Sequence, residues 1–323
     1  MNLYPLRFEP LLRRYIWGGR RLETLLGKSL PAGEDFAESW ELVDHQQGQS
    51  VVQFGPLQGL SLHDLCQQFG EELLGVGNSG SGFPLLFKFI DAQQDLSLQV
   101  HPDDQAAATL DPPDRGKTEA WVVLHADPDS RLYAGLRPGV DRERLETELS
   151  AGDIEQCLQC FRPQPGDCFL IKAGLVHAIG SGLVIAEIQQ ASDTTFRLHD
   201  WNRVGADGQS RPLHLEQALE VIDFEAEPIV RQESIRGDQE NHAERLLECE
   251  KFVLDRCSFQ GKMSVGGDGK FHILVMLRGQ VEMDLDPSQL PLQSGQVCLI
   301  PAETDPVELV ASEAVTWLDI YLP

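Results

Sequence analysis

Short apolar runs recur along most of this chain, and turns containing Gly or Pro separate them. Residues 83–92 form one such run, residues 166–180 form two around a Gly turn, and residues 183–190 form another. After residue 245 the same pattern continues at regular spacing. Many short strands separated by turns are typical of a β-sandwich or β-barrel. We therefore predict a mainly β protein.

The order of residues suggests that the chain contains two related β units. The sequence LRGQVEM (277–283) followed by GQVCLIPA (295–302) repeats the order found in GDCFLIKAG (166–174). We predict a first unit over residues 1–235, with helical insertions at about 61–75 and 141–161, and a second over 246–323. Residues 226–245 are polar and charged, which is typical of a linker. The second unit has one histidine, His272, in an apolar strand, and we expect a core or edge residue without a metal site.

Composition limits the partners and the compartment of this protein. Its 323 residues carry a formal charge of −25, which argues against nucleic acid or an anionic membrane but allows a small anion held by local cations. Seven cysteines without a repeated spacing do not resemble a disulfide framework, and we interpret Cys157 and Cys160 as ordinary cysteines in a helix. No apolar run is long enough to span a membrane, and the N-terminus does not resemble a signal peptide. We expect a cytoplasmic protein.

Residues 97–119 bring four chemically useful side chains into a short span. Gln99 and His101 alternate with apolar residues, so on a strand they would point to one face, about 7 Å apart. Pro102 ends this strand because it removes a backbone donor. After a polar turn, Lys117 and Glu119 repeat the same spacing at the start of another apolar run. Two such strands predict half of a metal site with a cation beside it.

His177 is the histidine that best completes this site. It ends a strand in an otherwise apolar stretch, whereas His125 and His199 lie among polar residues and are interpreted as surface residues. Two imidazoles and two oxygen donors suit zinc with an open position, and they also suit iron or manganese.

Lys88 interrupts an otherwise apolar strand, and two explanations remain open. Its ammonium group could reach outward to solvent along the strand surface, or an anion could hold it inside the protein. The pattern alone does not decide between them.

Several motifs in a fixed order carry a resemblance that covers nearly the whole chain, more loosely after residue 245. These stretches are WGG (17–19), ESWEL (38–42), FPLLFKFIDA (83–92), LSLQVHPDD (96–104), GKTEAW (116–121) and HAIGSGLVIAEIQQASDTTFRLHDWNR (177–203). In them the chain resembles the type I phosphomannose isomerases, in particular the shorter bacterial class, which are zinc-dependent members of the cupin superfamily. Two departures stand out: Ile179 and Gly180 lie where longer eukaryotic-type members have an aromatic residue, and Ala120 lies where cysteine is common.

The resemblance implies two cupin-like jelly-roll units and a set of site residues. It implies one zinc ion per chain, catalytic roles for Lys117 and Arg197, and phosphate contacts from Lys88 and Ser97. The zinc ligands that it implies agree with the set suggested by spacing, namely Gln99, His101, Glu119 and His177.

The implied reaction interconverts mannose 6-phosphate and fructose 6-phosphate by moving a proton between C2 and C1 through a cis-enediol. Lys117 would act as the acid/base, or it would only contact substrate oxygens while another group moves the proton. Arg197 would stabilise the enediolate, or it would form a buried pair with Glu187 or Asp193.

A different class of function is a metal-binding cupin that is not an isomerase, such as a dioxygenase or a sugar-phosphate-binding regulator. A non-haem iron oxygenase more usually presents two histidines and one carboxylate. Gln99 and the nearby cations favour an anionic sugar instead.

Overall fold

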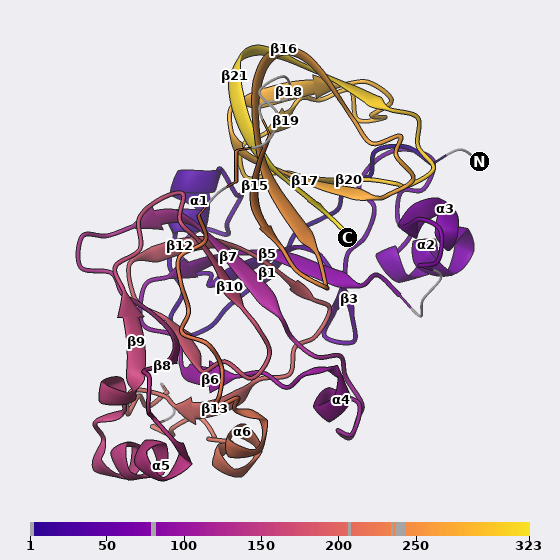
Figure 1. The fold of residues 1–323 in the computed structure, drawn as a ribbon. Coiled ribbons are helices and arrows are strands. Elements are labelled where there is room, and N and C mark those ends of the chain that lie inside the picture. Colours follow the sequence, from indigo (N-terminus) through magenta and orange to yellow (C-terminus); the bar gives the residue numbers. More distant parts are fainter. Residues whose placement is uncertain (1–2, 79–81, 206–207, 234, 237–242) are drawn as a thin grey trace.

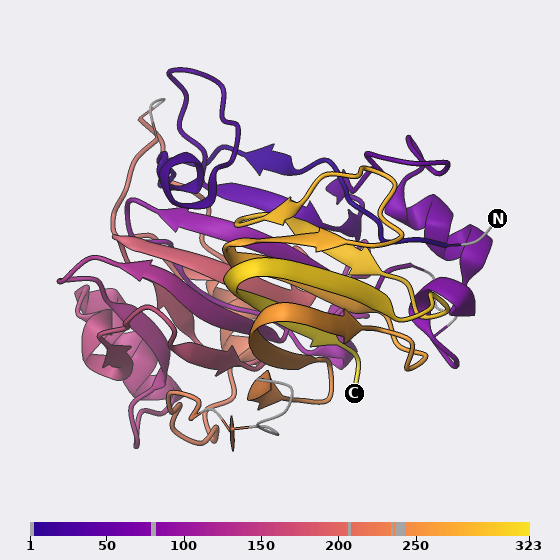
Figure 2. The same cartoon turned by 90° about the horizontal axis from the view of Figure 1, so that it is seen from above.

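The computed structural model describes residues 3–78, 82–205, 208–233, 235–236 and 243–323. The fold is mainly β, as predicted, and three sheets form successive layers (Figure 1). The five-stranded sheet lies at one end of the molecule, the six-stranded sheet in the middle, and the C-terminal strands at the other end. Figure 2 shows the C-terminal unit lying over part of the six-stranded sheet.

The strands pair in antiparallel fashion within each sheet. In spatial order the six-stranded sheet contains β1 (Leu11–Arg13), β2 (Glu38–Leu42), β5 (Leu85–Ala92), β12 (Leu183–Gln190), β7 (Glu119–Ala126) and β10 (Cys168–Ile171). The five-stranded sheet contains β13 (Phe196–His199), β6 (Leu98–Val100), β11 (His177–Ile179), β8 (Leu132–Leu136) and β9 (Leu158–Phe161). The short strands β3 (Asp44–His45) and β4 (Gly48–Gln49) form a separate hairpin.

The C-terminal unit is built on two long, bent strands. Its sheet contains β14 (Ile235–Arg236), β15 (Ala243–Glu248), β16 (Val253–Val265), β21 (Val307–Tyr321), β17 (His272–Arg278) and β20 (Val297–Ile300), with β18 (Gln280–Met283) and β19 (Leu292–Gln293) at the side.

The six-stranded sheet is buried on both faces because it lies between the other two. Along β12, Ala186 and Ile188 belong to the core shared with the C-terminal strands. Leu183 and Ile185 belong to the core that faces the five-stranded sheet. Successive side chains of a strand point to opposite faces, so a strand with apolar residues at nearly every position suits this middle layer. All eight residues of β12 are buried.

Helices are short and lie outside the sheets. They are α1 (Arg21–Leu26), α2 (Leu62–Phe69), α3 (Glu71–Leu74), α4 (Asp104–Ala107), α5 (Arg142–Ala151), the 3₁₀-helix η1 (Ile154–Cys157) and α6 (Leu215–Val221). Ser61 caps the N-terminus of helix α2, because Ser61 and Asp64 form a reciprocal capping box. No helix of the described residues is long and apolar enough to cross a membrane.

The N-terminal residues pack against the C-terminal unit. Leu6 and Leu299 exchange two backbone hydrogen bonds of 2.8 Å. The backbone carbonyl of Leu73 also accepts a hydrogen bond of 3.1 Å from Ala302. The division into units at 1–235 and 246–323 stays a prediction, and these contacts show that the two parts share one core.

Three predictions about local structure need correction or fall outside the described residues. The stretch 141–161 is not one helix, because α5 ends at Gly152 in the left-handed region and β9 follows η1. Cys157 therefore lies in η1 and Cys160 in a strand, and all seven cysteines are free. The predicted linker 226–245 includes β14 and the start of β15, although residues 234 and 237–242 lie outside the described residues.

Candidate metal centre and active site

Three predicted site residues lie in one row across the five-stranded sheet. His177 on β11 pairs with Gln99 on β6, and Gln99 pairs on its other side with Arg197 on β13. Opposed residues of neighbouring strands point to the same face. The strand pairing therefore places an imidazole, an amide and a guanidinium group side by side, although they are far apart in the sequence.

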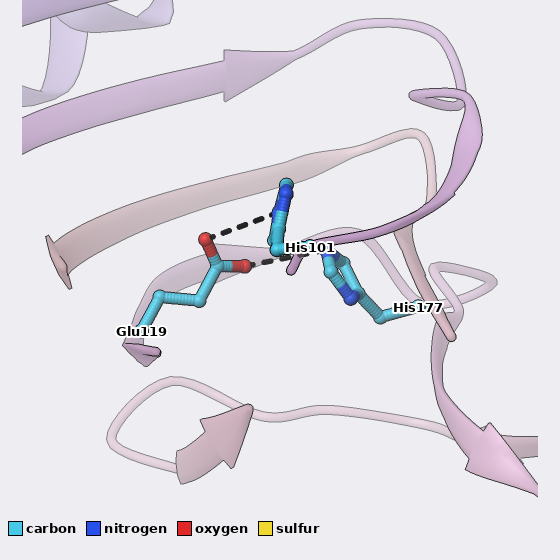
Figure 3. Close-up of side chains that lie close together, drawn as sticks. All are labelled: His101, Glu119 and His177. Carbon is cyan, nitrogen blue, oxygen red and sulfur yellow. Dashed lines mark ion pairs between the residues drawn. The ribbon is translucent and has the colours of Figure 1, made fainter. Parts of the chain in front are cut away.

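Glu119 enters the same site from the six-stranded sheet, where it is the first residue of β7. Its Oε1 lies 3.4 Å from His177 Nε2, and its Oε2 lies 3.6 Å from His101 Nε2 (Figure 3). One possible ligand atom from each of the three residues lies within 4.8 Å of the others, and all three residues are buried.

The outward nitrogen of each imidazole is held by a backbone carbonyl. His101 Nδ1 lies 2.9 Å from the carbonyl of Thr194, and His177 Nδ1 lies 2.8 Å from that of Leu175. A proton assigned to Nδ1 leaves Nε2 with a free lone pair facing Glu119. Burial lowers the pKa of His101 well below its ordinary value and that of His177 to about 4. Both rings are therefore neutral, which is the state that binds a metal.

The buried carboxylate of Glu119 has one close cation among the described residues, the Lys117 ammonium group at 3.0 Å from Oε2. Its Oε1 accepts no hydrogen bond from those residues. Burial, and after it the charge of Glu187, raises the pKa of Glu119 to about 7. A cation between the three side chains would favour the ionised form. Two neutral imidazoles and this carboxylate therefore fit a divalent metal ion.

Gln99 borders the same space with its amide group. Its Nε2 lies 3.3 Å from His177 Nε2, and its Oε1 accepts a hydrogen bond of 3.4 Å from Ser97 Oγ. The two ends of an amide are assigned from such contacts. If the amide is rotated by half a turn, its oxygen faces the side of His177 Nε2. An amide oxygen, unlike an amide nitrogen, can donate a lone pair to a metal ion.

Lys117 lies beside the three residues as predicted. Its Nζ is 3.0 Å from Glu119 Oε2 and 3.2 Å from His101 Nε2, and the side chain is buried. The backbone around it is also held, because the N–H groups of Gly116 and Thr118 donate to side chains of Asp104 and Gln190 at 2.9 and 3.1 Å. A Cβ on Gly116 would come within 2.4 Å of the backbone nitrogen of Asp104, so this close approach requires glycine.

Lys88 is held inside the protein rather than reaching to solvent. Its Nζ lies 3.2 Å from Glu187 Oε1 and 3.4 Å from Glu38 Oε1, and the side chains of all three residues are less than 10% exposed. Burial opposes the charge of Lys88, but the attraction of Glu187 and Glu38 outweighs it and raises the pKa. Glu187 also accepts a hydrogen bond of 3.0 Å from Trp121. Of the two explanations that the sequence left open for Lys88, the structure supports the second.

Arg197 does not form the buried pair with Glu187 or Asp193 that the sequence left open. Its Nη1 donates a hydrogen bond of 2.8 Å to the carbonyl of Pro212. Its Nε is buried and has no partner among the described residues.

Five of the eight predicted site residues line a cavity of about 270 Å³, whereas His101, Glu119 and His177 do not border it. The five that line it are Lys88, Ser97, Gln99, Lys117 and Arg197. Sequence reasoning missed Glu38, Tyr15 and Arg211, which also line the cavity. Glu38 belongs to the motif ESWEL (38–42), but only the pairing of β2 with β5 brings it next to Lys88.

The fold and the site together define a cupin-type β protein with a candidate metal centre. Residues 6–135 match the family model for the type I phosphomannose isomerase catalytic domain, and residues 242–315 match that for the mannose-6-phosphate isomerase cupin domain. The chain belongs to the type I phosphomannose isomerase family.

Relatives and solved structures agree with this membership. Mannose-6-phosphate isomerase ManA of Bacillus subtilis (strain 168) is 35% identical over 93% of this chain and 94% of its own. Mannose-6-phosphate isomerase of Streptococcus mutans is 33% identical over 92% of each chain. A crystal structure of mannose 6-phosphate isomerase from Bacillus subtilis matches with a TM-score of 0.90 and 26% identity, covering 99% of this chain and all of the other.

Proposed function

We propose that this protein interconverts mannose 6-phosphate and fructose 6-phosphate. The observation that carries the proposal is the buried cluster of His101, Glu119 and His177 with the Lys117 ammonium group 3.0 Å from the carboxylate. Family membership supports the same reaction, since the relatives that match nearly the whole chain are mannose-6-phosphate isomerases.

Gln99, His101, Glu119 and His177 would hold a zinc ion in this site. Zinc accepts imidazole nitrogen and carboxylate or amide oxygen, and it suits a proton transfer because no electron is exchanged. When bound, the ion supplies Lewis-acid stabilisation of negative charge on the substrate oxygens. The hydrogen bonds from both Nδ1 atoms to backbone carbonyls would fix the direction in which the two imidazoles present their lone pairs.

Lys117 would act as the acid/base that moves the proton between C2 and C1. A general base must lie within hydrogen-bonding reach of the proton that it removes, and the side chain of Lys117 borders the cavity. The neutral amine of Lys117 would be the base, and its ammonium form would be the acid. The three backbone hydrogen bonds made by residues 116–118 would hold it in position. The alternative is that Lys117 only contacts substrate oxygens while another group moves the proton.

Arg197 would stabilise the negative charge of the enediolate. A guanidinium group stays charged throughout the pH range of catalysis, and Arg197 lies in the same strand row as Gln99. Its buried Nε has no partner among the described residues, so a substrate oxygen could accept a hydrogen bond from it.

Ser97 and Lys88 keep their proposed roles as phosphate contacts. The hydroxyl of Ser97 is buried and borders the cavity, so it can donate to an anion. Lys88 borders the cavity as well, but Glu38 and Glu187 already balance its charge. Its attraction for a dianion would therefore be smaller than that of an unpaired lysine.

The reaction is tested by metal analysis of the purified protein together with a coupled assay on mannose 6-phosphate. We expect close to one zinc per chain, loss of turnover on chelation, and recovery when zinc is restored. Zinc-restored protein that fails to turn over mannose 6-phosphate would favour a dioxygenase or a sugar-phosphate-binding regulator. All seven cysteines are free, which fits the reducing cytoplasm that we propose as its location.

A further inference from the structure

The two lysines of the cavity are already balanced by carboxylates. Lys88 contacts Glu38 and Glu187, and Lys117 contacts Glu119. A sugar 6-phosphate carries its reacting carbons and its phosphate at opposite ends. The phosphate brings a charge of about −1.5 to −2 at neutral pH. It therefore needs positive charge that is not already balanced and that lies away from the metal ligands.

The two remaining cations that line the cavity are Arg197 and Arg211, and they lie side by side. The backbone carbonyl of Pro212 accepts a hydrogen bond from Arg197, and the backbone carbonyl of Arg197 accepts one from His214 at 2.8 Å. The segment that carries Arg211 therefore runs along the end of the Gln99–Arg197 row. Burial, and after it the charge of Arg211, lowers the pKa of Arg197, so the two positive charges repel each other.

Asp200 holds Arg211 in a fixed orientation. Arg211 donates from Nε to Asp200 Oδ2 at 2.8 Å and from Nη2 to Oδ1 at 2.5 Å, and Asp200 is buried. This two-point contact leaves the other terminal nitrogen of Arg211, Nη1, for a ligand. Arg203 also donates to Asp200 Oδ1, so one carboxylate is shared between two guanidinium groups.

Positive charge is therefore in excess at this rim. Arg197 contacts no carboxylate among the described residues, and Asp200 balances only one of its two arginines. Asp193 also lines the cavity, but among the described residues it forms no ion pair with Arg197 or Arg211.

We propose that Arg211, oriented by Asp200, binds the phosphate group of the substrate at the rim of the cavity. This inference rests on the proposed function and names a residue of its substrate site. Guanidinium groups suit phosphate because their planar N–H groups match its oxygens, and a partly exposed arginine can reach a ligand without moving buried groups. The phosphate would lie against Arg211, and the reacting carbons would lie toward Arg197 and Lys117.

The test compares Arg211→Gln with Arg203→Gln in the zinc-loaded enzyme. Both variants remove one guanidinium group from Asp200. Of these two arginines, Arg211 lines the cavity and Arg203 does not. Arg211→Gln should raise KM for mannose 6-phosphate by about tenfold or more, the effect of losing a charge-assisted hydrogen bond, with a smaller change in kcat. Arg203→Gln should raise KM by less than about threefold. Arg211→Lys keeps the charge and should recover part of the affinity.

Competitive inhibitors separate phosphate binding from other effects. The inhibition constant of inorganic phosphate should rise in Arg211→Gln by a factor close to that of KM, whereas that of unphosphorylated mannose should stay near the wild-type value. An equal rise for mannose would indicate a general distortion of the cavity and overturn the proposal. The proposal would also be overturned if Arg211→Gln kept the wild-type KM for mannose 6-phosphate and the wild-type inhibition constant for inorganic phosphate. Lys88 and Ser97 would then be the residues that bind the phosphate.

Failure of the proposed reaction would give a different result. If the wild-type protein does not turn over mannose 6-phosphate, calorimetry with inorganic phosphate still compares the wild type with Arg211→Gln. Tighter binding to the wild type would support the anion site without the isomerase reaction. Equal binding would reject the anion site as well.

Discussion

Lys251 of the C-terminal unit donates a hydrogen bond of 2.7 Å to Asp104, the first residue of α4, which precedes Lys117 in the chain. The other oxygen of Asp104 accepts hydrogen bonds of 2.9 Å from the backbone of Gly116 and from the side chain of Gln190. One carboxylate thus connects the C-terminal unit to the backbone beside the proposed acid/base. The C-terminal unit therefore contributes to the position of Lys117 as well as to the shared core.

Asp104→Ala should lower kcat by about three- to tenfold at unchanged zinc content, because Gly116 and Gln190 lose an acceptor and the Lys117 backbone becomes less well held. Lys251→Met should have a smaller effect, within about threefold, since the ion pair is partly exposed. Steady-state kinetics and zinc analysis check both. Lys262→Met, which breaks an exposed pair with Glu308, is the matched control and should behave as wild type. Wild-type kcat in Asp104→Ala would contradict the positioning role.

His177→Ala should lose zinc and turnover together, because it removes one of two buried imidazoles that face Glu119. Zinc analysis after gel filtration and the coupled assay measure the two effects. His125→Ala provides the control, since His125 is partly exposed and pairs with Asp127 away from the site. A His177→Ala protein with full zinc content and turnover would remove this residue from the ligand set.

Lys117→Ala should keep zinc and lose most turnover, by about 10²- to 10⁴-fold, which is the usual contribution of a positioned acid/base. The ammonium group contacts Glu119 and His101, so zinc affinity is the necessary second measurement. Lys262→Ala removes an exposed lysine of the C-terminal unit and serves as the control. If Lys117→Ala retains turnover near wild type, another group must move the proton.

His272 makes stability depend on pH in the C-terminal unit. Its Nδ1 lies 2.8 Å from Asp319 and its Nε2 lies 3.2 Å from Asp268. Burial opposes a charge on the ring, but the hydrogen bond and charge of Asp319, with Asp268, outweigh it and raise the pKa of His272. Burial also raises the pKa of Asp319. Both shifts favour the protonated forms in the folded state.

The stabilising effect of the His272 proton is therefore complete below about pH 6.5, the ordinary histidine value, and is lost as the pH rises through the higher folded-state pKa. Replacement His272→Gln should cost about 1–3 kcal/mol at pH 6 and less at pH 9. Denaturant unfolding of both proteins across this range measures the difference. A cost for His272→Gln that grows with pH would show that the ring is neutral in the folded protein.

Much of the candidate metal site could be predicted from residue order. Alternation predicted one face for Gln99 and His101, although β6 ends at Val100 and His101 follows it. The apolar surroundings of His177 set it apart from His125 and His199. These patterns are local, because a strand's period of two determines side-chain direction without reference to the rest of the fold. The same local patterns predicted the mainly β class. They failed at residues 141–161, where a positive φ at Gly152 ends the helix.

The tertiary structure alone decided which charges are balanced. Lys88 pairs with Glu38 and Glu187 because β5 lies between β2 and β12, and a strand's neighbours in a sheet are not written in its own residues. Likewise, the sequence placed Asp200 near Arg203 but did not show that Arg211 shares the same carboxylate and borders the cavity. Local periodicity determined which residues could serve this protein's chemistry. Long-range pairing determined which of their charges remain available for a substrate, because electrostatic balance depends on distances in space.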